Sequence, residues 1–305
     1  MKGALIKLHL AVFLWGFTGV LGRSISLNEG LLVWWRLFLT VISMWLLFGL
    51  TRKVQKISFR EFLMIGGIGV LLALHWLCFY GSIKYANVSI ALTCLSASGF
   101  VSALLEPFFF KKRINPKELL FGSLTVVGIF LIYRTNLHFS VGIYIGMAAT
   151  FLTVIVSLFN KKIVDRYKPE TFTLYQLTGG FIGLCMLMPF YDHLFPSVTY
   201  LPHHADWIWL FVLAIACTLY TFMLYTQSLK KLSAFTVNLT LTLEPVYGIV
   251  LAFIIYHENR DLSANFYLGF ICILLAVALQ TLSLTRNKNV VKAAFPKWWQ
   301  FRIKH

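Results

Sequence analysis

The chain carries few charged residues, and acids are the scarcest of them. Only 12% of its 305 residues are charged, and Asp and Glu together number 11. A soluble domain of this length carries roughly 25% charged residues on its hydrated surface. The composition therefore excludes an ordinary soluble globular protein, and the mean hydropathy of +0.77 indicates a chain solvated by lipid.

The sequence also lacks the motifs of common enzymes and metal sites. It has no phosphate-binding glycine loop, no GxSxG and no paired catalytic carboxylates. The five cysteines fall inside apolar stretches without CxxC spacing, which is typical of packing residues. A loop at 191–206 gathers acids and histidines without the spacing of a metal site, namely Asp192, His193, His203, His204 and Asp206. We predict no enzyme activity, no cofactor and no bound metal.

Long apolar runs fill most of the chain. A membrane-spanning helix needs about 20 mostly apolar residues, and its backbone groups must be paired within the segment. The candidate spans lie near 8–23, 31–50, 61–82, 88–110, 118–134, 141–160, 171–190, 207–228, 234–256 and 264–284. The predicted fold class is an all-α integral membrane protein with ten transmembrane helices.

The net charge of +16 gives an orientation rather than a nucleic-acid partner. With the N-terminus inside, 22 of the 27 Lys and Arg residues fall in the termini and connections on the cytoplasmic side. The expected location is the cytoplasmic (inner) membrane, multi-pass, with both termini cytoplasmic. The tail at 286–305 alternates Trp with basic residues, which suits an anionic membrane surface. The expected partners are the lipid bilayer and a small solute, with no nucleic acid and no oligomeric state predicted.

Two stretches read as distant copies of one unit. Residues 79–122 align with 225–269, so that Lys84 meets Lys230 and Lys112 meets Glu258. A looser match sets LGRSI around Arg23 against FNKKI around Lys161. The loop after the first copy's core is basic and its counterpart, HENRD, is acidic, so the two copies are expected to be inverted in the membrane. We predict two inverted five-helix repeats, at 1–137 and 138–285.

Several short motifs carry a family resemblance across the chain. These are FLWGFTG, WWRLFL with Arg36, and LEPVYGIVLAFIIYHENRDLS. They resemble the EamA-type branch of the drug/metabolite transporter superfamily. Pro245, Glu258 and Gly269 match its pattern in the second half, whereas the first half has Gly99 and Lys112 where Pro and Glu are usual. The resemblance implies a secondary carrier, often an exporter of amino acids or other small metabolites, with a central cavity between the halves.

Two ionisable residues lie at membrane depth. Inserting such a residue at a helix centre costs about 2.5–3.5 kcal/mol, so each is expected to have a functional or structural role. Glu244 either binds a proton or a substrate ammonium, or is a protonated carboxyl that caps backbone groups freed by Pro245. Arg36 could attract a substrate carboxylate. Alternatively, its side chain extends to the outer membrane interface or forms an ion pair with a carboxylate. Pro107 and Pro245 are expected to kink their helices. Glu106 lies one turn from Lys111–Arg113 and is expected to form an ion pair there.

Aromatic and polar residues near these charges complete the predicted substrate site. It comprises Trp15, Arg36, His75, Trp76, Tyr175, Gln176, Glu244 and Tyr247, with Glu244 also the proton-coupling residue. Each has a structural alternative: His75 as a packing histidine, Gln176 as a bond between helices, and the aromatics as lipid-facing side chains. Small residues at helical spacing, such as Gly179, Gly180 and Gly183, indicate close helix packing.

The predicted function is secondary transport of small metabolites such as amino acids, as an exporter working by alternating access. Coupling to protons through Glu244 and exchange without an ion both fit this reading. The alternative is an integral-membrane enzyme or lipid-handling protein, which would need acid–base or nucleophilic residues clustered at one membrane face, and the sequence shows none. A membrane assembly protein is the third class, and it would leave the polar intramembrane residues dispensable.

The inverted topology is testable by single-cysteine labelling after the native thiols are removed. The opposite charges of the two loops place position 112 on the cytoplasmic side and position 258 on the outside. A membrane-impermeant thiol reagent added to intact cells should therefore label a cysteine at 258 and spare one at 112. The reverse pattern would contradict the inverted repeat.

Overall fold

A computed structural model shows a bundle of membrane-length helices. It describes residues 2–51, 54–111, 113, 116–135, 137–197, 199–232, 240–241, 243–260 and 262–286. The predicted tail beyond 286 and Lys112 lie outside this range. Within it all regular structure is helical: seven helical segments are long and apolar enough to cross a membrane, and three shorter apolar helices accompany them. Helices thus occupy the described parts of all ten predicted spans; the first part of the ninth, 234–239, lies outside the described residues.

The elements follow one another along the chain with short connections. The long and medium helices are α1 (Lys2–Ser24), α2 (Glu29–Met44), α3 (Phe59–Tyr85), α4 (Val88–Leu95), α5 (Ser98–Phe110), α6 (Pro116–Thr135), α7 (Ser140–Ile163), α8 (Pro169–Leu194), α9 (His204–Phe211), α10 (Thr221–Leu229), α12 (Leu243–Tyr256) and α13 (Ala264–Arg286). The short or wide helical segments are η1 (Trp45–Gly49), η2 (Leu137–Phe139), η3 (Val164–Arg166), η4 (Val212–Tyr220) and η5 (Glu258–Arg260).

Local sequence signals explain where several helices begin. Ser58 and Glu61 form a capping box at the start of α3. At the starts of α2 and α4, the side chains of Asn28 and Asn87 each accept a hydrogen bond from the backbone N–H three residues later. Pro169 occupies the first turn of α8, where its missing N–H costs nothing.

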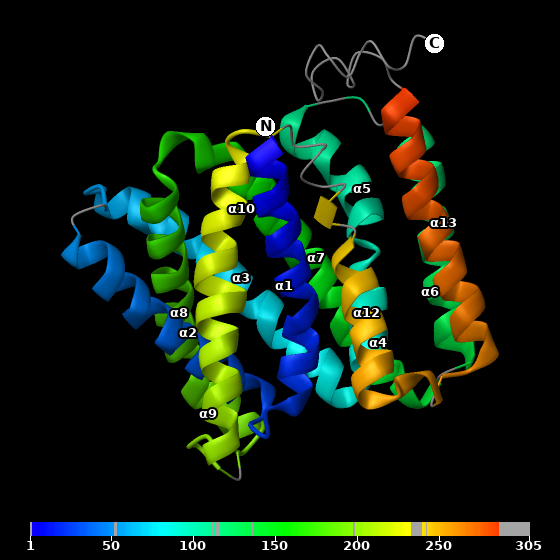
Figure 1. Ribbon diagram of the computed structural model, residues 1–305, viewed down its shortest axis with the longest axis horizontal. Helices are drawn as coiled ribbons and strands as arrows, with labels where there is room; N and C mark the ends of the chain where they lie inside the picture. Colours follow the sequence, from blue (N-terminus) through cyan, green and yellow to red (C-terminus); the bar gives the residue numbers. More distant parts are fainter. Residues whose placement is uncertain are drawn as a thin grey trace.

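The helices are arranged as two inverted halves. The first span of the first half, α1, packs on α10 and α12 of the second half; the first span of the second half, α7, packs on α3, α4 and α5 of the first. The last spans, α6 and α13, pack on each other at one side of the bundle (Figure 1). The start of α1 and the end of α13 lie at the same end of the bundle, which we call the inner end, and the opposite end the outer end. The exact boundary between the repeats, predicted at 137/138, stays a prediction.

The fourth span is interrupted near its middle. The backbone N–H of Ala97 bonds to the carbonyl of Cys94, and α5 begins only at Ser98. Pro107 lies within α5, which continues to Phe110, and Pro245 lies in the first turn of α12. The kinks predicted at these prolines stay predictions, because the residue before Leu243 is outside the described range. Discontinuous helices in corresponding spans of two halves are typical of the binding region of secondary transporters.

Glycine allows the closest helix contacts. A Cβ at Gly69 of α3 would lie 1.8 Å from the carbonyl oxygen of Gln176 on α8, and one at Gly179 would lie 2.1 Å from the Cα of Gly66. Close packing through small residues is therefore confirmed here, and it is how membrane helices associate without a hydrophobic driving force. Large apolar side chains such as Leu50, Phe108 and Met186 lie on the surface, where lipid solvates them.

Gly69→Ala should separate α3 from α8. The added methyl group meets backbone, which cannot move aside, so overpacking of about 1–3 kcal/mol is expected as a lower melting temperature. Gly67→Ala is the matched control, because a Cβ there has nothing within 4 Å and alanine favours the helix. Thermal unfolding of the two purified variants measures the difference. Equal melting temperatures would show that the contact does not limit stability.

Candidate functional site

Arg36 on α2 is a charged residue buried in the bundle core. It is 1% exposed. Its Nε donates to the Thr218 hydroxyl and its Nη1 to the Tyr80 hydroxyl, both at 2.8 Å. Neither acceptor is charged. The reading of Arg36 as a residue that reaches the outer interface is therefore wrong, since its side chain ends inside the protein.

An aromatic ring covers one face of the guanidinium. The Cζ of Arg36 lies 4.0 Å from the centroid of the Trp76 ring and 5.8 Å from that of Tyr80. A desolvated cation–π contact of this kind contributes about 2 kcal/mol. Together with the two hydrogen bonds, it offsets part of the cost of removing the cation from water.

Thr218 is positioned by a wide helical turn. It lies in η4, which has π-helical geometry, and its hydroxyl donates to the carbonyl of Leu213 at 2.7 Å. The same oxygen can then accept from Arg36, so Thr218 links η4 to α2. Short π-helical segments within α-helices often occur at functional sites.

Glu244 brings a carboxyl group toward this cation from the other half. It lies in the first turn of α12 and interacts electrostatically with both Arg36 and Tyr80. Among the described contacts the two charged side chains form no direct ion pair. Arg36 and Glu244 are thus a cationic group and a carboxyl group from different repeats that interact electrostatically.

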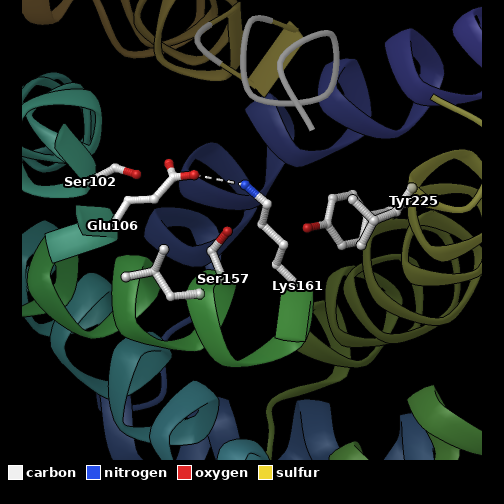
Figure 2. A pocket seen from close by; sticks show the side chains of 7 residues that line it. Ser102, Glu106, Ser157, Lys161 and Tyr225 are labelled. Atoms are coloured by element: carbon white, nitrogen blue, oxygen red, sulfur yellow. Dashed lines mark hydrogen bonds and ion pairs between the residues drawn. The ribbon is translucent and has the colours of Figure 1, made fainter. Parts of the chain in front are cut away.

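A row of aromatic rings leads from Arg36 toward the inner end. Trp76 packs on Phe222 with ring centroids 5.9 Å apart, Phe222 on Trp15 at 5.6 Å, and Trp15 on Tyr225 at 5.3 Å. Tyr225 borders a small pocket (Figure 2). The row therefore connects the buried Arg36 with a polar pocket near the inner end of the bundle.

That pocket contains an ion pair. Lys161 on α7 donates to Glu106 on α5 at 2.9 Å, and the Lys161 side chain lies between Glu106 and Tyr225 (Figure 2). The pairing of Glu106 with the Lys111–Arg113 run stays a prediction, because Lys112 lies outside the described residues. The cavity measures about 20 Å³, enough for a water molecule and too small for a metabolite. It is lined by Ser102, Glu106, Ser157, Leu158, Lys161, Tyr225 and Leu229.

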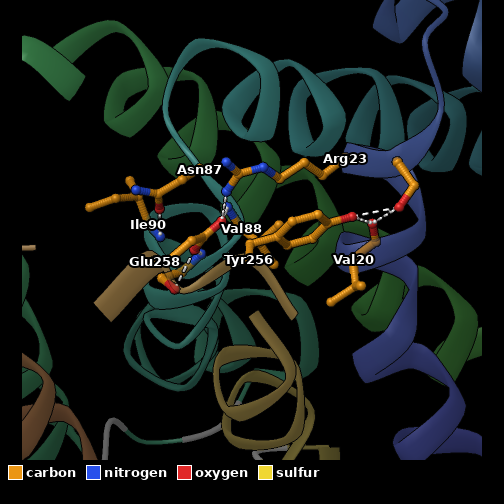
Figure 3. Close-up of polar contacts among 9 residues, drawn as sticks. Val20, Arg23, Asn87, Val88, Ile90, Tyr256 and Glu258 are labelled. Atoms are coloured by element: carbon orange, nitrogen blue, oxygen red, sulfur yellow. Dashed lines mark hydrogen bonds and ion pairs between the residues drawn. The ribbon is translucent and has the colours of Figure 1, made fainter. Parts of the chain in front are cut away.

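The outer end has a second polar cluster (Figure 3). Glu258 is fully buried and pairs with Arg23 of α1. Its two carboxylate oxygens also accept from the backbone N–H groups of Val88 at 3.0 Å and Ser89 at 2.8 Å. These N–H groups open α4, so Glu258 caps a helix of the other half and meets the positive end of its dipole.

The remaining predicted residues lie in contacts between helices. His75 bonds through Nδ1 to the carbonyl of Ala149 at 2.8 Å, which fits the packing alternative. Gln176 donates to Asn160 at 2.9 Å and links α8 to α7. Tyr175 packs on Trp45 and Phe62 with centroids about 6 Å away, and Tyr247 packs on Phe13 at 5.5 Å. Ring contacts connect Arg36, Trp76 and, through Phe222, Trp15, whereas the composition of the substrate site stays a prediction.

Three residues around Arg36 are not part of the predicted substrate site. Tyr80 and Thr218 accept hydrogen bonds from the guanidinium, and Phe222 joins Trp76 to Trp15. Tyr80 is one of the aromatic residues that could wall a cavity, and it lies one turn beyond Trp76 on the same helix face. Thr218 had no local signal, since nothing in its apolar surroundings predicts a π-helical turn.

The two acids of the 191–206 loop accept hydrogen bonds within the protein. Asp206 accepts from the backbone and side chain of Ser26, and Asp192 accepts from the backbone N–H of Ser197 and from the hydroxyl of Tyr200. Within the described residues no group of three or more His, Cys, Asp or Glu could hold a metal ion.

Known proteins match along nearly the whole chain. The model of the EamA-like transporter family matches residues 2–134 and again 140–282. An uncharacterized transporter of Bacillus subtilis, YxxF, is 25% identical over 296 residues, covering 94% of this chain and 92% of that one. An uncharacterized transporter of Haemophilus influenzae is 22% identical over 248 residues, covering 78% and 79%. One crystal structure of a protein superposes with a TM-score of 0.65 at 16% identity, covering 94% of this chain and 99% of that one, which shows the shared fold.

Tyr80→Phe should lower the free energy of unfolding, because it leaves the buried Arg36 cation with one hydrogen-bond acceptor fewer. It keeps the ring but removes the acceptor of Nη1, so a loss of about 1.5–3 kcal/mol in the free energy of unfolding is expected. Tyr144→Phe is the matched control: its hydroxyl bonds to Tyr133 at 2.8 Å on the surface, where a loss below about 0.5 kcal/mol is expected. Chemical denaturation in detergent measures both. Equal losses would mean that Arg36 does not depend on Tyr80.

Proposed function

Because the chain belongs to the EamA-like transporter family, we propose that it is a secondary transporter of the cytoplasmic membrane that exports small metabolites such as amino acids by alternating access. The observation that carries the proposal is the buried Arg36, whose Nε and Nη1 donate to the neutral hydroxyls of Thr218 and Tyr80. An ionic group costs several kcal/mol at this depth, and intramembrane charges of this kind mark solute pathways.

The residues around Arg36 suit a solute with one acid and one amine. The guanidinium offers a planar fork for a carboxylate, and Tyr80 and Thr218 are neutral partners that a carboxylate can replace. Glu244 supplies a carboxyl group for an ammonium. Trp76, Phe222 and Trp15 line the route with rings that accommodate an apolar side chain. These features favour zwitterionic metabolites such as amino acids.

Export follows from the proposed orientation. The row of rings from Trp76 to Tyr225 leads toward the inner end, where the chain starts and α13 finishes. The basic residues place this end in the cytoplasm. A cytoplasmic solute would reach Arg36 along this row and leave at the outer end after the carrier changes conformation.

Glu244 is the proposed proton site. It is a titratable group of the second half that faces a cation of the first half, so its charge affects how the halves fit together. A carrier conformation that exposes Glu244 to water holds a proton with a different affinity from one that buries it. Proton occupancy and carrier state are then coupled by linkage.

Glu244→Gln tests this proposal. A thermal-shift screen against amino acids, nucleosides and sugars identifies a solute, and its transport is then followed in proteoliposomes between pH 5.5 and 8. The wild type should show a pH-dependent rate. The variant keeps size and hydrogen bonding but cannot titrate, so its rate should become independent of pH.

Arg36→Gln is the companion variant. It removes the cation that the carboxylate requires, so the solute should lose at least tenfold in affinity, whereas Arg36→Lys should keep part of it. If Glu244→Gln transports at the wild-type rate with the same pH profile, Glu244 is structural and proton coupling at this residue is rejected. If no solute of the three classes shifts the melting temperature or is transported, the proposed substrate class is rejected.

A further inference from the structure

The two ion pairs at opposite ends occupy corresponding places in the inverted halves. We call Arg23 with Glu258 the outer pair, and Lys161 with Glu106 the inner pair. Arg23 lies near the end of α1 and Lys161 near the end of α7, which are the first spans of the two halves. The sequence alignment of LGRSI with FNKKI places these two cations at the same position.

The aromatic neighbours of the two cations also correspond. The Arg23 guanidinium lies 4.5 Å from the centroid of the Tyr256 ring, and the Lys161 ammonium lies 5.1 Å from that of Phe110. The alignment of 79–122 with 225–269 pairs Phe110 with Tyr256. Each ring ends the fourth span of the opposite half, α12 or α5. The two ends thus share a cation and an aromatic contact.

The carboxylates correspond in space but not in sequence. Glu258 follows Tyr256 by two residues, whereas Glu106 precedes Phe110 by one helical turn. The alignment sets Lys112 against Glu258, so the equivalent acid of the first half is absent. Glu106, from the preceding turn, nonetheless reaches the cation of α7. Each pair therefore joins the first span of one half to the fourth span of the other.

A third contact repeats at both ends. Lys84 at the end of α3 donates to the carbonyl of Ile25 at 2.5 Å, and Lys230 after α10 donates to the carbonyl of Tyr167 at 2.7 Å. Lys84 and Lys230 are aligned residues, and each holds the backbone just after the first span of its own half. The helix ends that carry Arg23 and Lys161 are therefore anchored in the same way.

We propose that the outer and inner pairs are the two gates of the carrier, each broken in turn while the other holds. The proposal rests on alternating access as the mode of transport. Each pair bridges the two halves at one end only: separating α1 from the end of α12 opens the outer pair, and separating α7 from α5 opens the inner pair, while the tight contact of α3 with α8 stays closed. Both pairs are formed in this structure, and the inner cavity has room only for water, which describes an occluded carrier.

The outer gate is the stronger of the two. Glu258 is fully buried and also caps α4 through two backbone N–H groups and the Ser89 hydroxyl. The two cations are exposed to a similar degree, 37% at Arg23 and 30% at Lys161, so the difference lies in the carboxylates: Glu106 is 25% exposed and borders a cavity that admits water. Partly exposed pairs are weak. The inner gate therefore opens more easily than the outer gate.

A cysteine reporter on α1 tests the two gates. All five native cysteines are replaced, and Thr18→Cys is introduced. Thr18 is 5% exposed and shares a helix face with Gly22, which packs on Tyr80, so it lies between Arg36 and the outer pair. The measured quantity is the rate at which a charged thiol reagent labels the full-length protein in detergent, where both ends are accessible and no solute is needed.

Glu106→Gln should slow labelling at position 18 roughly two- to fivefold, because opening the inner gate depletes outward-facing molecules. Arg23→Gln should accelerate it by a similar factor or more, and Arg23→Lys should restore the original rate. Arg134→Gln is the matched control: it removes a cation that contacts Phe130 on its own helix, so no change is expected. The effect of Glu106→Gln is decisive, since that residue lies at the opposite end from the reporter.

Each outcome separates this proposal from the proposed function. Labelling rates that do not change, or that change in the same direction in Glu106→Gln and Arg23→Gln, overturn the gates even if transport is measured. Opposite shifts without transport of any solute support the gates and refute the proposed cargo. Should Arg23→Gln fail to fold, Lys161→Gln must reproduce the effect of Glu106→Gln, because both break the same pair; a Lys161→Gln variant that labels at the original rate also overturns the proposal.

Discussion

A charge within a bilayer must find its partners inside the protein, and this constraint organises the polar interior of the molecule. Arg36 is held by two hydroxyls and an aromatic face. Glu258 is held by a cation and the start of a helix. In each case the partners come from a different helix and, for Glu258, from the other half of the chain. Polar groups here are therefore the points at which helices are fixed to one another, whereas the apolar surface only places them in lipid.

The packing between helices determines which of these polar contacts can open. The contact of α3 with α8 through glycine leaves little room for sliding, because backbone meets backbone. The contact of α1 with α12 and that of α7 with α5 depend at their ends on ion pairs that water can replace. Rigid contacts and replaceable contacts thus alternate around the bundle. The rigid contact joins α3 of the first half to α8 of the second, so these two helices stay together, and movement is left to the contacts that the ion pairs close.

The sequence predicted the helices well because hydropathy is a local property. All ten spans and the capping signals at Asn28, Ser58 and Pro169 can be read from a short window of residues. The sequence also singled out Arg36, which is buried in the structure, because a charge in an apolar span leaves few alternatives. The partners were harder to predict. Thr218 lies 182 residues from Arg36, and a π-helical turn, which no sequence signal marks, positions it.

Glu258 shows most clearly where sequence reasoning ends. Its place in an acidic loop gave the correct contrast with the basic loop of the first half, but not its burial or its role as a cap of α4. The alignment of the halves sets Lys112 against Glu258 and so suggests that the two ends differ in chemistry. In space they are alike, because Glu106 supplies the acid from one turn earlier. The constraint acts on the position of a carboxylate next to a cation, and any residue of the fourth span that reaches this position satisfies it. The sign of a loop's charge therefore reports the orientation of a repeat, whereas the contacts that join the repeats must be found in three dimensions.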